Sequence, residues 1–354
     1  MENIIKNKLL LWYRKNHRKL PWRKLYKNRL PNPYYIFISE YMLQQTTVNT
    51  VQNRFSEFIN LWPNVKLLAK ISRSRILIFW SGLGYYSRAK NLLLASKIIH
   101  TNYKDKIPDN YEDLISLPGI GDYTAKAILG IAYNKPVLPL DANIERVLAR
   151  LHCIKQPLIK NKNKLKKIAS FYISKKSSTN LIQAFMDYGS LICLPRIPIC
   201  DKCVIREHCK ANRENVQNLI PFKPKKRSKK LIKYSRAYVL SNEKNEIIIR
   251  KRLDIGMLAS MIEVPNDPWV NKKTELRSDK IIKKIQKKLL LKGKIRYSFS
   301  HFDLYVDVFF AKIVKKKYSN VMWLSKNKIY SSGMPTAMKK IVEKGLVYIN
   351  FFNL

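Results

Sequence analysis

The sequence predicts a multidomain chain in which an all-α domain is followed by a smaller α+β domain. Apolar residues first recur at helical spacing, and beyond about residue 230 they alternate as in β-strands. Between the two patterns lies PFKPKKRSKK (221–230), a proline- and lysine-rich segment typical of a linker. We therefore expect a helical domain over 1–213, a basic linker over 214–234 and a second domain over 235–354.

Apolar stripes separated by short Gly, Pro and Asn punctuation define the first domain. The stripes are Leu9, Trp12 and Tyr13, then Val48, Val51, Phe55 and Phe58, then 76–80, 92–99 and 125–132. In the second domain we expect strands over 237–240, 247–250, 294–299 and 303–310, with a helix over 281–290. Lys and Arg interrupt the apolar pattern of the first twenty residues, and no uncharged apolar run is long enough to cross a membrane. We therefore expect neither a signal peptide nor a membrane partner.

The charge balance indicates a polyanionic partner. The 69 Lys and Arg face 24 acidic residues, for a formal net charge of +45, and nucleic acid is the simplest partner of such a chain. AT-rich coding, which favours Lys, Ile and Asn, is the alternative source of part of this charge. Apolar residues at 46% provide for real cores, and few cysteines suit a reducing cytosol. We expect a cytoplasmic, nucleoid-associated protein that acts as a monomer.

Four of the five cysteines follow the pattern Cys193-x6-Cys200-x2-Cys203-x5-Cys209. Four thiolates in one loop can hold zinc or an iron–sulfur cluster. Zinc ribbons commonly use two C-x2-C pairs, and here only Cys200 and Cys203 form such a pair. The spacing therefore favours one [4Fe–4S] cluster, with zinc and free buried thiols as the alternatives.

A hairpin between two helices is predicted over LPGIGDYTAKAI (117–128). Gly119 and Gly121 allow a turn with exposed backbone amides, and a helix N-terminus follows at Asp122. Such a turn can bind a DNA phosphate, although an ordinary helix–turn–helix corner has the same pattern.

Two carboxylates stand out. Glu40 lies in SEYMLQQT (39–46) after an apolar run, and burial there would raise its pKa as a general acid requires; a solvated helix face is the alternative. Asp141 opens LDANIERV (140–147), where it and Asn143 are typical of a helix N-terminus. Its functional interpretation is a carboxylate at the mouth of a pocket that faces a bound DNA strand. The amides of Gln44 and Gln45 suit base edges.

A glycine turn, GLGYYSR (82–88), presents two tyrosines and a base. An aromatic side chain on such a turn can wedge into a base stack. We assign this role to Tyr85, and core packing competes as the explanation for one of the two tyrosines.

Together these motifs resemble the helix–hairpin–helix DNA glycosylases with an iron–sulfur cluster, and among them the adenine glycosylases of the MutY type. The resemblance covers nearly the whole chain, with the motifs in the family's order: LPWR (20–23), SEYMLQQT (39–46), GLGYYSRA, LPGIGDYTA (117–125), LDANIERVLAR (140–150) and the four-cysteine loop. It implies a helix–hairpin–helix domain and one [4Fe–4S] cluster on the four cysteines. A short insertion separates LPWR from SEYMLQQT.

The resemblance also implies roles for site residues. Glu40 would protonate adenine at N7, and Asp141 would stabilise the sugar cation, as paired carboxylates do in glycosidases. Leu20, Trp22 and Arg23 would line the adenine pocket, and Tyr123 and Asn143 would orient Asp141 and the sugar. Gln45 and Tyr85 would fill the gap left by the flipped base. The cluster would brace a loop whose Arg206, Lys210 and Arg213 contact phosphates.

The second domain resembles the MutT-like (Nudix-fold) domain by which these glycosylases recognise 8-oxoguanine. Phe299, Ser300 and His301, followed by Phe302, match the family's FSH loop, whose serine contacts the oxidised base. MutT hydrolases carry an REUxEE-type acidic run, where U is aliphatic, and 256–267 contain no such run. The domain is therefore expected to recognise DNA without hydrolysing nucleotides.

The implied function is excision of adenine opposite 8-oxoguanine or guanine in double-stranded DNA. The alternatives are an endonuclease III-like glycosylase/lyase and a catalytically decayed mismatch-binding protein. Endonuclease III carries a Schiff-base lysine where this chain has Tyr123, and some adenine glycosylases carry a crosslinking lysine where it has Glu145. We therefore expect a monofunctional enzyme.

Overall fold

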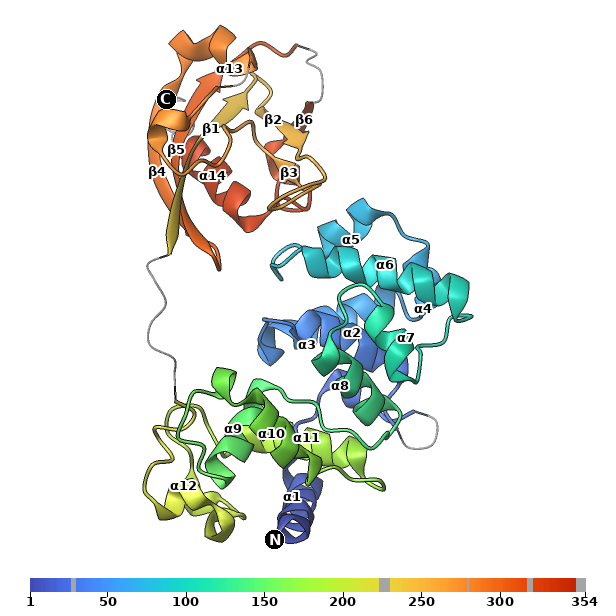
Figure 1. Ribbon diagram of the computed structural model, residues 1–354. Helices are drawn as coiled ribbons and strands as arrows, with labels where there is room; N and C mark the ends of the chain where they lie inside the picture. The colour runs from blue at the N-terminus through green and yellow to red at the C-terminus, as the bar shows by residue number, and fades with distance from the viewer. Residues whose placement is uncertain (27–29, 223–229, 279, 317–320, 348–354) are drawn as a thin grey trace. The chain divides into compact units, whose positions relative to one another are not determined.

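The computed structural model describes residues 1–26, 30–222, 230–278, 280–316 and 321–347. The chain divides into two compact units, Met1–Ile71 with Ser87–Arg227 as unit 1 and Ser72–Tyr86 with Ser228–Leu354 as unit 2. Unit 1 is helical and unit 2 contains a sheet flanked by helices (Figure 1), which confirms the predicted fold classes. The segment Ser72–Tyr86, which the sequence placed in the first domain, packs with unit 2, where Ser81 donates to the carbonyl of Met334 over 3.4 Å.

Unit 1 is built from helices joined by short turns. Its principal helices are α1 Glu2–Asn16, α2 Pro33–Leu43, α3 Val48–Leu61, α4 Val65–Ala69, α6 Ser87–Asn102, α7 Tyr111–Ser116, α8 Asp122–Ala132, α9 Ala142–Leu151, α10 Lys162–Ser170, α11 Ser178–Leu191 and α12 Lys210–Arg213. Helix α11 packs against α1, α8 and α9, and α2 packs against α3 and α8. The two helices that carry the predicted carboxylates, α2 and α9, therefore both adjoin this shared interior.

Local sequence explains where α2 and α9 begin. Helix α2 has Pro33 at its first position, and the side chain of Asn32 accepts a hydrogen bond from the amide of Tyr34 over 2.9 Å. Eight of the eleven residues of α2 are buried, since its apolar residues surround the whole helix. Helix α9 begins after Asp141, whose carboxylate accepts from the amide of Ile144 over 2.7 Å.

Unit 2 contains a mixed sheet. Its strands are β1 Leu231–Ser241, β2 Glu246–Lys251, β3 Ile262–Glu263, β4 Leu290–Ser298, β5 Phe302–Lys312 and β6 Met322–Ser325. The order is β3-β2-β1-β5-β4, with β6 also paired to β2. Strands β1 and β5 run parallel from the pair Leu231 and Phe302 to the pair Ser241 and Lys312, and the other pairs are antiparallel.

Apolar side chains cover both faces of this sheet. Alternate residues of β5, from Phe302 to Phe310, join the core beneath α14 (Thr336–Leu346). On the other face a smaller cluster includes Tyr238 of β1 and Ile282 of α13 (Lys280–Ile285). The short helix α5 (Arg73–Phe79) completes unit 2.

Two predicted boundaries differ from the structure. The helix predicted over 281–290 ends at Ile285, and Leu290 already belongs to β4, because Leu290 and Leu291 pair with Phe310 and Phe309 of β5. Strand β1 begins at Leu231, inside the predicted linker 214–234, because its parallel pairing with β5 extends that far. The linker residues 223–229 lie outside the described residues.

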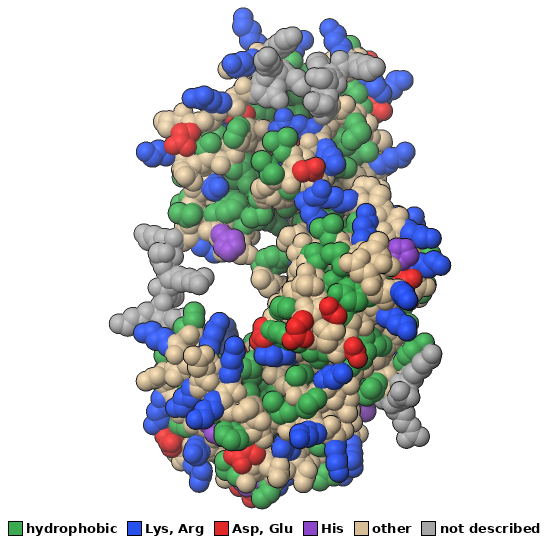
Figure 2. Space-filling view, turned by 45° about the vertical axis from the view of Figure 1, so that its right-hand side comes forward, with side chains coloured by type: hydrophobic (Ala, Val, Ile, Leu, Met, Phe, Trp, Pro, Cys, Tyr) green, Lys and Arg blue, Asp and Glu red, His purple; other side chains and the backbone are tan. Residues whose placement is uncertain are grey.

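The surface matches the charge balance of the sequence. On the face drawn in Figure 2, lysine and arginine side chains are spread over both units and acidic ones are sparse. Among the described residues, no helix has the length and apolarity needed to cross a membrane.

Candidate active site

One cavity of unit 1 collects the predicted catalytic residues and the residues predicted to contact adenine. It has a volume of about 570 Å³. Its walls include Leu20, Trp22, Arg23, Glu40, Gln44, Gln45, Tyr123, Asp141 and Asn143. These residues come from the 3-10 turn Pro21–Arg23 and from α2, α8 and α9 with their flanking turns. Four segments far apart in the sequence thus meet at a single concave site.

Glu40 lies in the interior rather than on a solvated helix face. Only 6% of its surface is exposed. The pKa of Glu40 is raised to about 8, because burial and, to a smaller extent, the charge of Asp141 raise it more than a hydrogen bond from Tyr123 lowers it. A carboxylic acid with that pKa is protonated at neutral pH and can donate its proton.

Asp141 is both a helix cap and a cavity residue. One carboxylate oxygen accepts from the amide of Ile144, and the other accepts from the Nδ2 amide of Asn143 over 2.8 Å. Burial raises the pKa of Asp141, and these two hydrogen bonds oppose the rise because they stabilise the ionised form. The positive end of the α9 dipole acts in the same sense.

Tyr123 stands beside both acids. It lies in the first turn of α8 and hydrogen-bonds Glu40. Burial, followed by the charges of Glu40 and Asp141, raises the pKa of Tyr123 well above its usual range. The phenol therefore stays neutral and acts as a hydrogen-bond donor near the two carboxyl groups.

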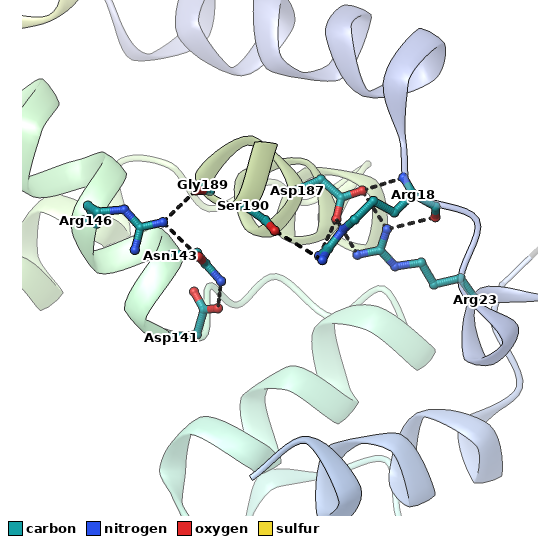
Figure 3. Close-up of polar contacts among 8 residues, drawn as sticks. All are labelled: Arg18, Arg23, Asp141, Asn143, Arg146, Asp187, Gly189 and Ser190. Atoms are coloured by element: carbon teal, nitrogen blue, oxygen red, sulfur yellow. Dashed lines mark hydrogen bonds and ion pairs between the residues drawn. The ribbon is translucent and has the colours of Figure 1, made fainter. Parts of the chain in front are cut away.

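A buried ion-pair cluster, which the sequence analysis missed, supports the pocket wall (Figure 3). Asp187 of α11 is fully buried and pairs with the guanidinium groups of Arg18 and Arg23, each at 2.7 Å. Burial alone would raise the pKa of Asp187, but the two arginines lower it overall. Arg23 is thereby fixed in the cavity wall despite the insertion that follows it. Asp187 does stand alone in an apolar helix, the same signal that singled out Glu40.

A second network, also missed, runs from Asp141 through Asn143 to Arg146 (Figure 3). Arg146 of α9 donates to the side-chain oxygen of Asn143 over 2.9 Å and to the carbonyl of Gly189 over 2.6 Å. Its Nε donates to the carbonyl of Cys193 over 2.8 Å. Arg146 therefore connects Asn143, the partner of Asp141, to the first residue of the cysteine loop.

The turn between α7 and α8 has the predicted hairpin form. Gly119 adopts a left-handed φ of +84°, and a Cβ there would lie 2.8 Å from the side chain of Asn91. Its carbonyl accepts a hydrogen bond from Gln44 over 3.2 Å. Gly121 caps α8 with an ordinary φ of −103° and open space around its Cα. Glycine is thus required at position 119, while Gly121 leaves the helix N-terminus accessible.

The residues expected to enter the DNA stack have unusual backbones. Gln45 and Tyr85 are non-glycine residues at φ 58° and 46°, a conformation that costs free energy and clusters at functional sites. Gln45 lines the active-site cavity of unit 1. Tyr85 belongs to unit 2, where its hydroxyl lies 2.7 Å from that of Ser300.

The hairpin between β4 and β5 carries the predicted base-reading residues. Ser300 and His301 are exposed at its tip, and Phe299 is half-buried. Two acidic residues upstream are unavailable to a magnesium ion: Glu263 pairs with Arg250 and Arg252, and Asp267 pairs with Arg236.

The four cysteines lie in one loop between α11 and α12. All four are half-buried free thiols, and within the described ranges no three His, Cys, Asp or Glu side chains converge as metal ligands. Their chemistry nevertheless fits a shared cation. Burial, together with the charges of the other three thiolates, raises the pKa of Cys209 to about 11. A cationic centre would relieve this mutual repulsion among soft ligands.

The fold and this pair of carboxyl groups define the class first. Residues 38–172 match the HhH-GPD superfamily of base excision DNA repair proteins, and residues 236–344 match the NUDIX domain. A thermostable thymine-DNA glycosylase has 25% identity and a TM-score of 0.53, covering 60% of this chain and 97% of its own. An endonuclease III–DNA complex, at 18% identity and a TM-score of 0.51 over 61% and 99% of the chains, shows the fold alone.

Curated relatives narrow the class to one family. The adenine DNA glycosylase of Buchnera aphidicola subsp. Schizaphis graminum is 33% identical over 353 residues, covering 95% of this chain and 96% of that protein. The human adenine DNA glycosylase is 25% identical over 397 residues, covering 94% and 72%. The chain belongs to the adenine DNA glycosylase family.

Proposed function

We propose that this protein removes adenine paired with 8-oxoguanine or guanine in double-stranded DNA by hydrolysing the N-glycosidic bond. The observation that carries the proposal is the pair of carboxyl groups in one cavity, with Glu40 at a pKa of about 8 and Asp141 held by donors that favour its ionised form. Paired groups with opposed protonation states supply an acid and an anion at the same pH.

The chemistry follows from these two states. Because a base within a duplex is out of reach, the adenine is flipped into the cavity, where Leu20, Trp22 and Arg23 contact it. Glu40 donates its proton to N7, so the bond from C1′ to N9 breaks with adenine leaving as a neutral base. Asp141 stabilises the positive charge that develops on the sugar, and water adds at C1′ to leave an abasic site.

The neighbouring residues orient the reacting groups. Asn143 and Tyr123 hold Asp141 and the sugar in place, and Gln44 approaches the base edge. The amides at Gly119 and Gly121 bind a phosphate of the same strand, while Gln45 and Tyr85 fill the space of the flipped base. Tyr123 offers no amine for a Schiff base, so the enzyme is monofunctional.

We also assign one [4Fe–4S] cluster to Cys193, Cys200, Cys203 and Cys209. When bound, the cluster supplies iron–thiolate bonds that hold the loop in one conformation. The loop then presents Arg206, Lys210 and Arg213 to DNA phosphates.

Unit 2 supplies the preference for the oxidised base. Ser300 contacts 8-oxoguanine, flanked by Phe299 and His301 at the hairpin tip. The arginine pairing of Glu263 and Asp267 supports recognition without magnesium-dependent hydrolysis. We assign the protein a monomeric state and a place with the nucleoid in the cytoplasm.

The test is single-turnover excision from a duplex with adenine opposite 8-oxoguanine, followed by hot alkali. Duplexes with cytosine opposite 8-oxoguanine and with thymine glycol run alongside. The proposal predicts cleavage at adenine only, and only after alkali. Cleavage at thymine glycol without alkali would place the enzyme with endonuclease III, and binding without excision would identify a decayed mismatch-binding protein.

A further inference from the structure

The exposed tip of the β4–β5 hairpin is anchored by the ring of Phe299. This ring lies 4.9 Å from both Tyr297 and Phe302 and 5.4 Å from Trp269, measured between centroids. The amide of Phe299 donates to the carbonyl of Phe302 over 2.9 Å, which closes the turn. Ser300 follows Phe299 directly, so the placement of this ring constrains where the backbone of Ser300 lies, while the Ser300 hydroxyl itself lies 2.7 Å from that of Tyr85.

Trp269 is itself held by contacts with the core and with strand β1 of unit 2. It lies far from the hairpin in sequence, in the segment that follows β3, and packs against the core shared with α14. Its neighbour Val270 exchanges two backbone hydrogen bonds with Tyr234 of β1, at 2.8 and 3.0 Å. The indole is therefore tied to the core and to strand β1 of unit 2.

A buried charge network holds the indole in place. The guanidinium carbon of Arg252 lies 4.8 Å from the centre of the Trp269 ring. Arg252 pairs with Glu263, which is 3% exposed and also accepts from Arg250 over 2.8 Å and from Asn266 over 2.7 Å. A cation–π contact gains strength when the cation is partly desolvated, and only 21% of the Arg252 side chain is exposed.

We propose that Trp269 is a positioning residue that sets the preference for 8-oxoguanine over guanine by holding Phe299, and with it Ser300, in the reading conformation. The inference rests on the proposed function, in which this hairpin contacts the oxidised base. If the tip were loosely held, binding of the oxidised base would first have to order it, and this ordering would weaken the binding free energy. Excision of adenine opposite guanine does not depend on that contact and should persist.

The experiment compares single-turnover excision of adenine opposite 8-oxoguanine with excision opposite guanine, and uses the ratio of the two rates. Trp269→Leu should lower this ratio about three- to tenfold, the range expected for loss of one aromatic pair. Trp269→Phe should retain most of it. The matched control is Trp323→Leu, since Trp323 packs against the core on the opposite face of the sheet, and this variant should keep the parental ratio.

One further variant, Ser300→Ala, makes each outcome decisive. Ser300→Ala lowers the ratio if the hairpin reads the base. A reduced ratio for Ser300→Ala with a parental ratio for Trp269→Leu would overturn the role of Trp269 alone. Parental ratios for both would overturn base reading by the hairpin as well. Equal losses for the Trp269 and Trp323 variants would reduce the effect to general damage of unit 2 and overturn the inference.

Hydrogen exchange gives a second readout. Exchange at the Phe299 amide should accelerate in Trp269→Leu and stay parental in Trp323→Leu, because only the first removes the anchor of the turn. If Trp269→Leu does not fold, Arg252→Met removes the stacked cation and leaves the indole, and should lower the rate ratio about twofold. A parental ratio and parental exchange in that variant would refute the proposal.

Discussion

The pH dependence of excision tests the assignment of Glu40 most directly. Burial, followed by the charge of Asp141, raises the pKa of Glu40 from its ordinary value of 4.5 to about 8 against the lowering effect of the Tyr123 hydrogen bond. Only the protonated form can act as general acid. The excision rate should therefore hold steady near neutral pH and fall as pH rises through about 8.

The expected magnitude follows from the titration curve. With a pKa of about 8, excision at pH 9 should run at roughly one tenth of its rate at pH 7. Glu40→Gln should be about 10²- to 10⁴-fold slower and should lose this pH dependence. The assay is single-turnover excision with excess enzyme from about pH 6 to pH 9.5. The control Glu145→Gln removes another half-buried acid, one that lines a different cavity, and should keep the decline.

The same pKa sets a cost in stability. Since the folded pKa lies above the ordinary value, the folded protein binds more protons between pH 4.5 and about 8. The contribution of Glu40 to the free energy of unfolding therefore falls as pH rises through that window, by on the order of 5 kcal/mol in total. Urea unfolding at both ends of the window should show a smaller fall in the free energy of unfolding for Glu40→Gln.

An excision rate independent of pH up to about 9.5, or a decline lost in Glu145→Gln, would refute the assignment of Glu40.

Three other substitutions follow from the site. Asp187→Asn leaves two arginines without their buried partner and should lower the free energy of unfolding, measured in urea at neutral pH, by about 3 kcal/mol. Because the pKa of Asp187 is lowered, this loss of stability should shrink in acid. An equal loss at all pH values would contradict the ion-pair account. Tyr123→Lys places an amine beside both acids, so borohydride should trap a covalent DNA adduct absent from the parent. Asp141→Asn keeps a cap of similar strength, so stability should change little while excision falls about 10²- to 10³-fold; unfolding of this variant, or parental excision, would count against separate capping and charge roles.

Sequence alone predicts the architecture well where the pattern is local. The change from helical to alternating spacing locates the two fold classes, and β5 appears where 303–310 alternate. Boundaries set by tertiary pairing are harder to place. The run at Leu289–Leu291 suits a helix end by composition, yet pairing with β5 draws Leu290 and Leu291 into β4. Likewise, only the partner strand shows that β1 begins at Leu231.

In the candidate site, too, the sequence predicts residues marked by local motifs but not those brought together by long-range contacts. Glu40 and Asp141 are marked by local motifs and do meet in one cavity. The partners of Asp187 are separated from it by more than 160 residues, so no local pattern links them. The bond from Arg146 to the carbonyl of Cys193 likewise depends on how α9 packs beside the cysteine loop. Such long-range contacts are fixed by the fold rather than by any motif.

Glu40 and Asp141 suit the proposed acid and anion roles because they occupy different positions relative to their helices. Glu40 lies in the last turn of α2, where the backbone amides are already bonded within the helix, so the hydrogen bond that lowers its pKa comes from the Tyr123 phenol. Asp141 lies just before α9, where the first amides lack helical partners, and the carboxylate takes one of them together with the Asn143 amide. The two charges repel each other across the cavity, so one proton settles where solvation is poorer, on Glu40. The helix cap at Asp141 and its proposed anionic role in catalysis therefore depend on one interaction, because the hydrogen bond that starts α9 also favours the ionised form of Asp141.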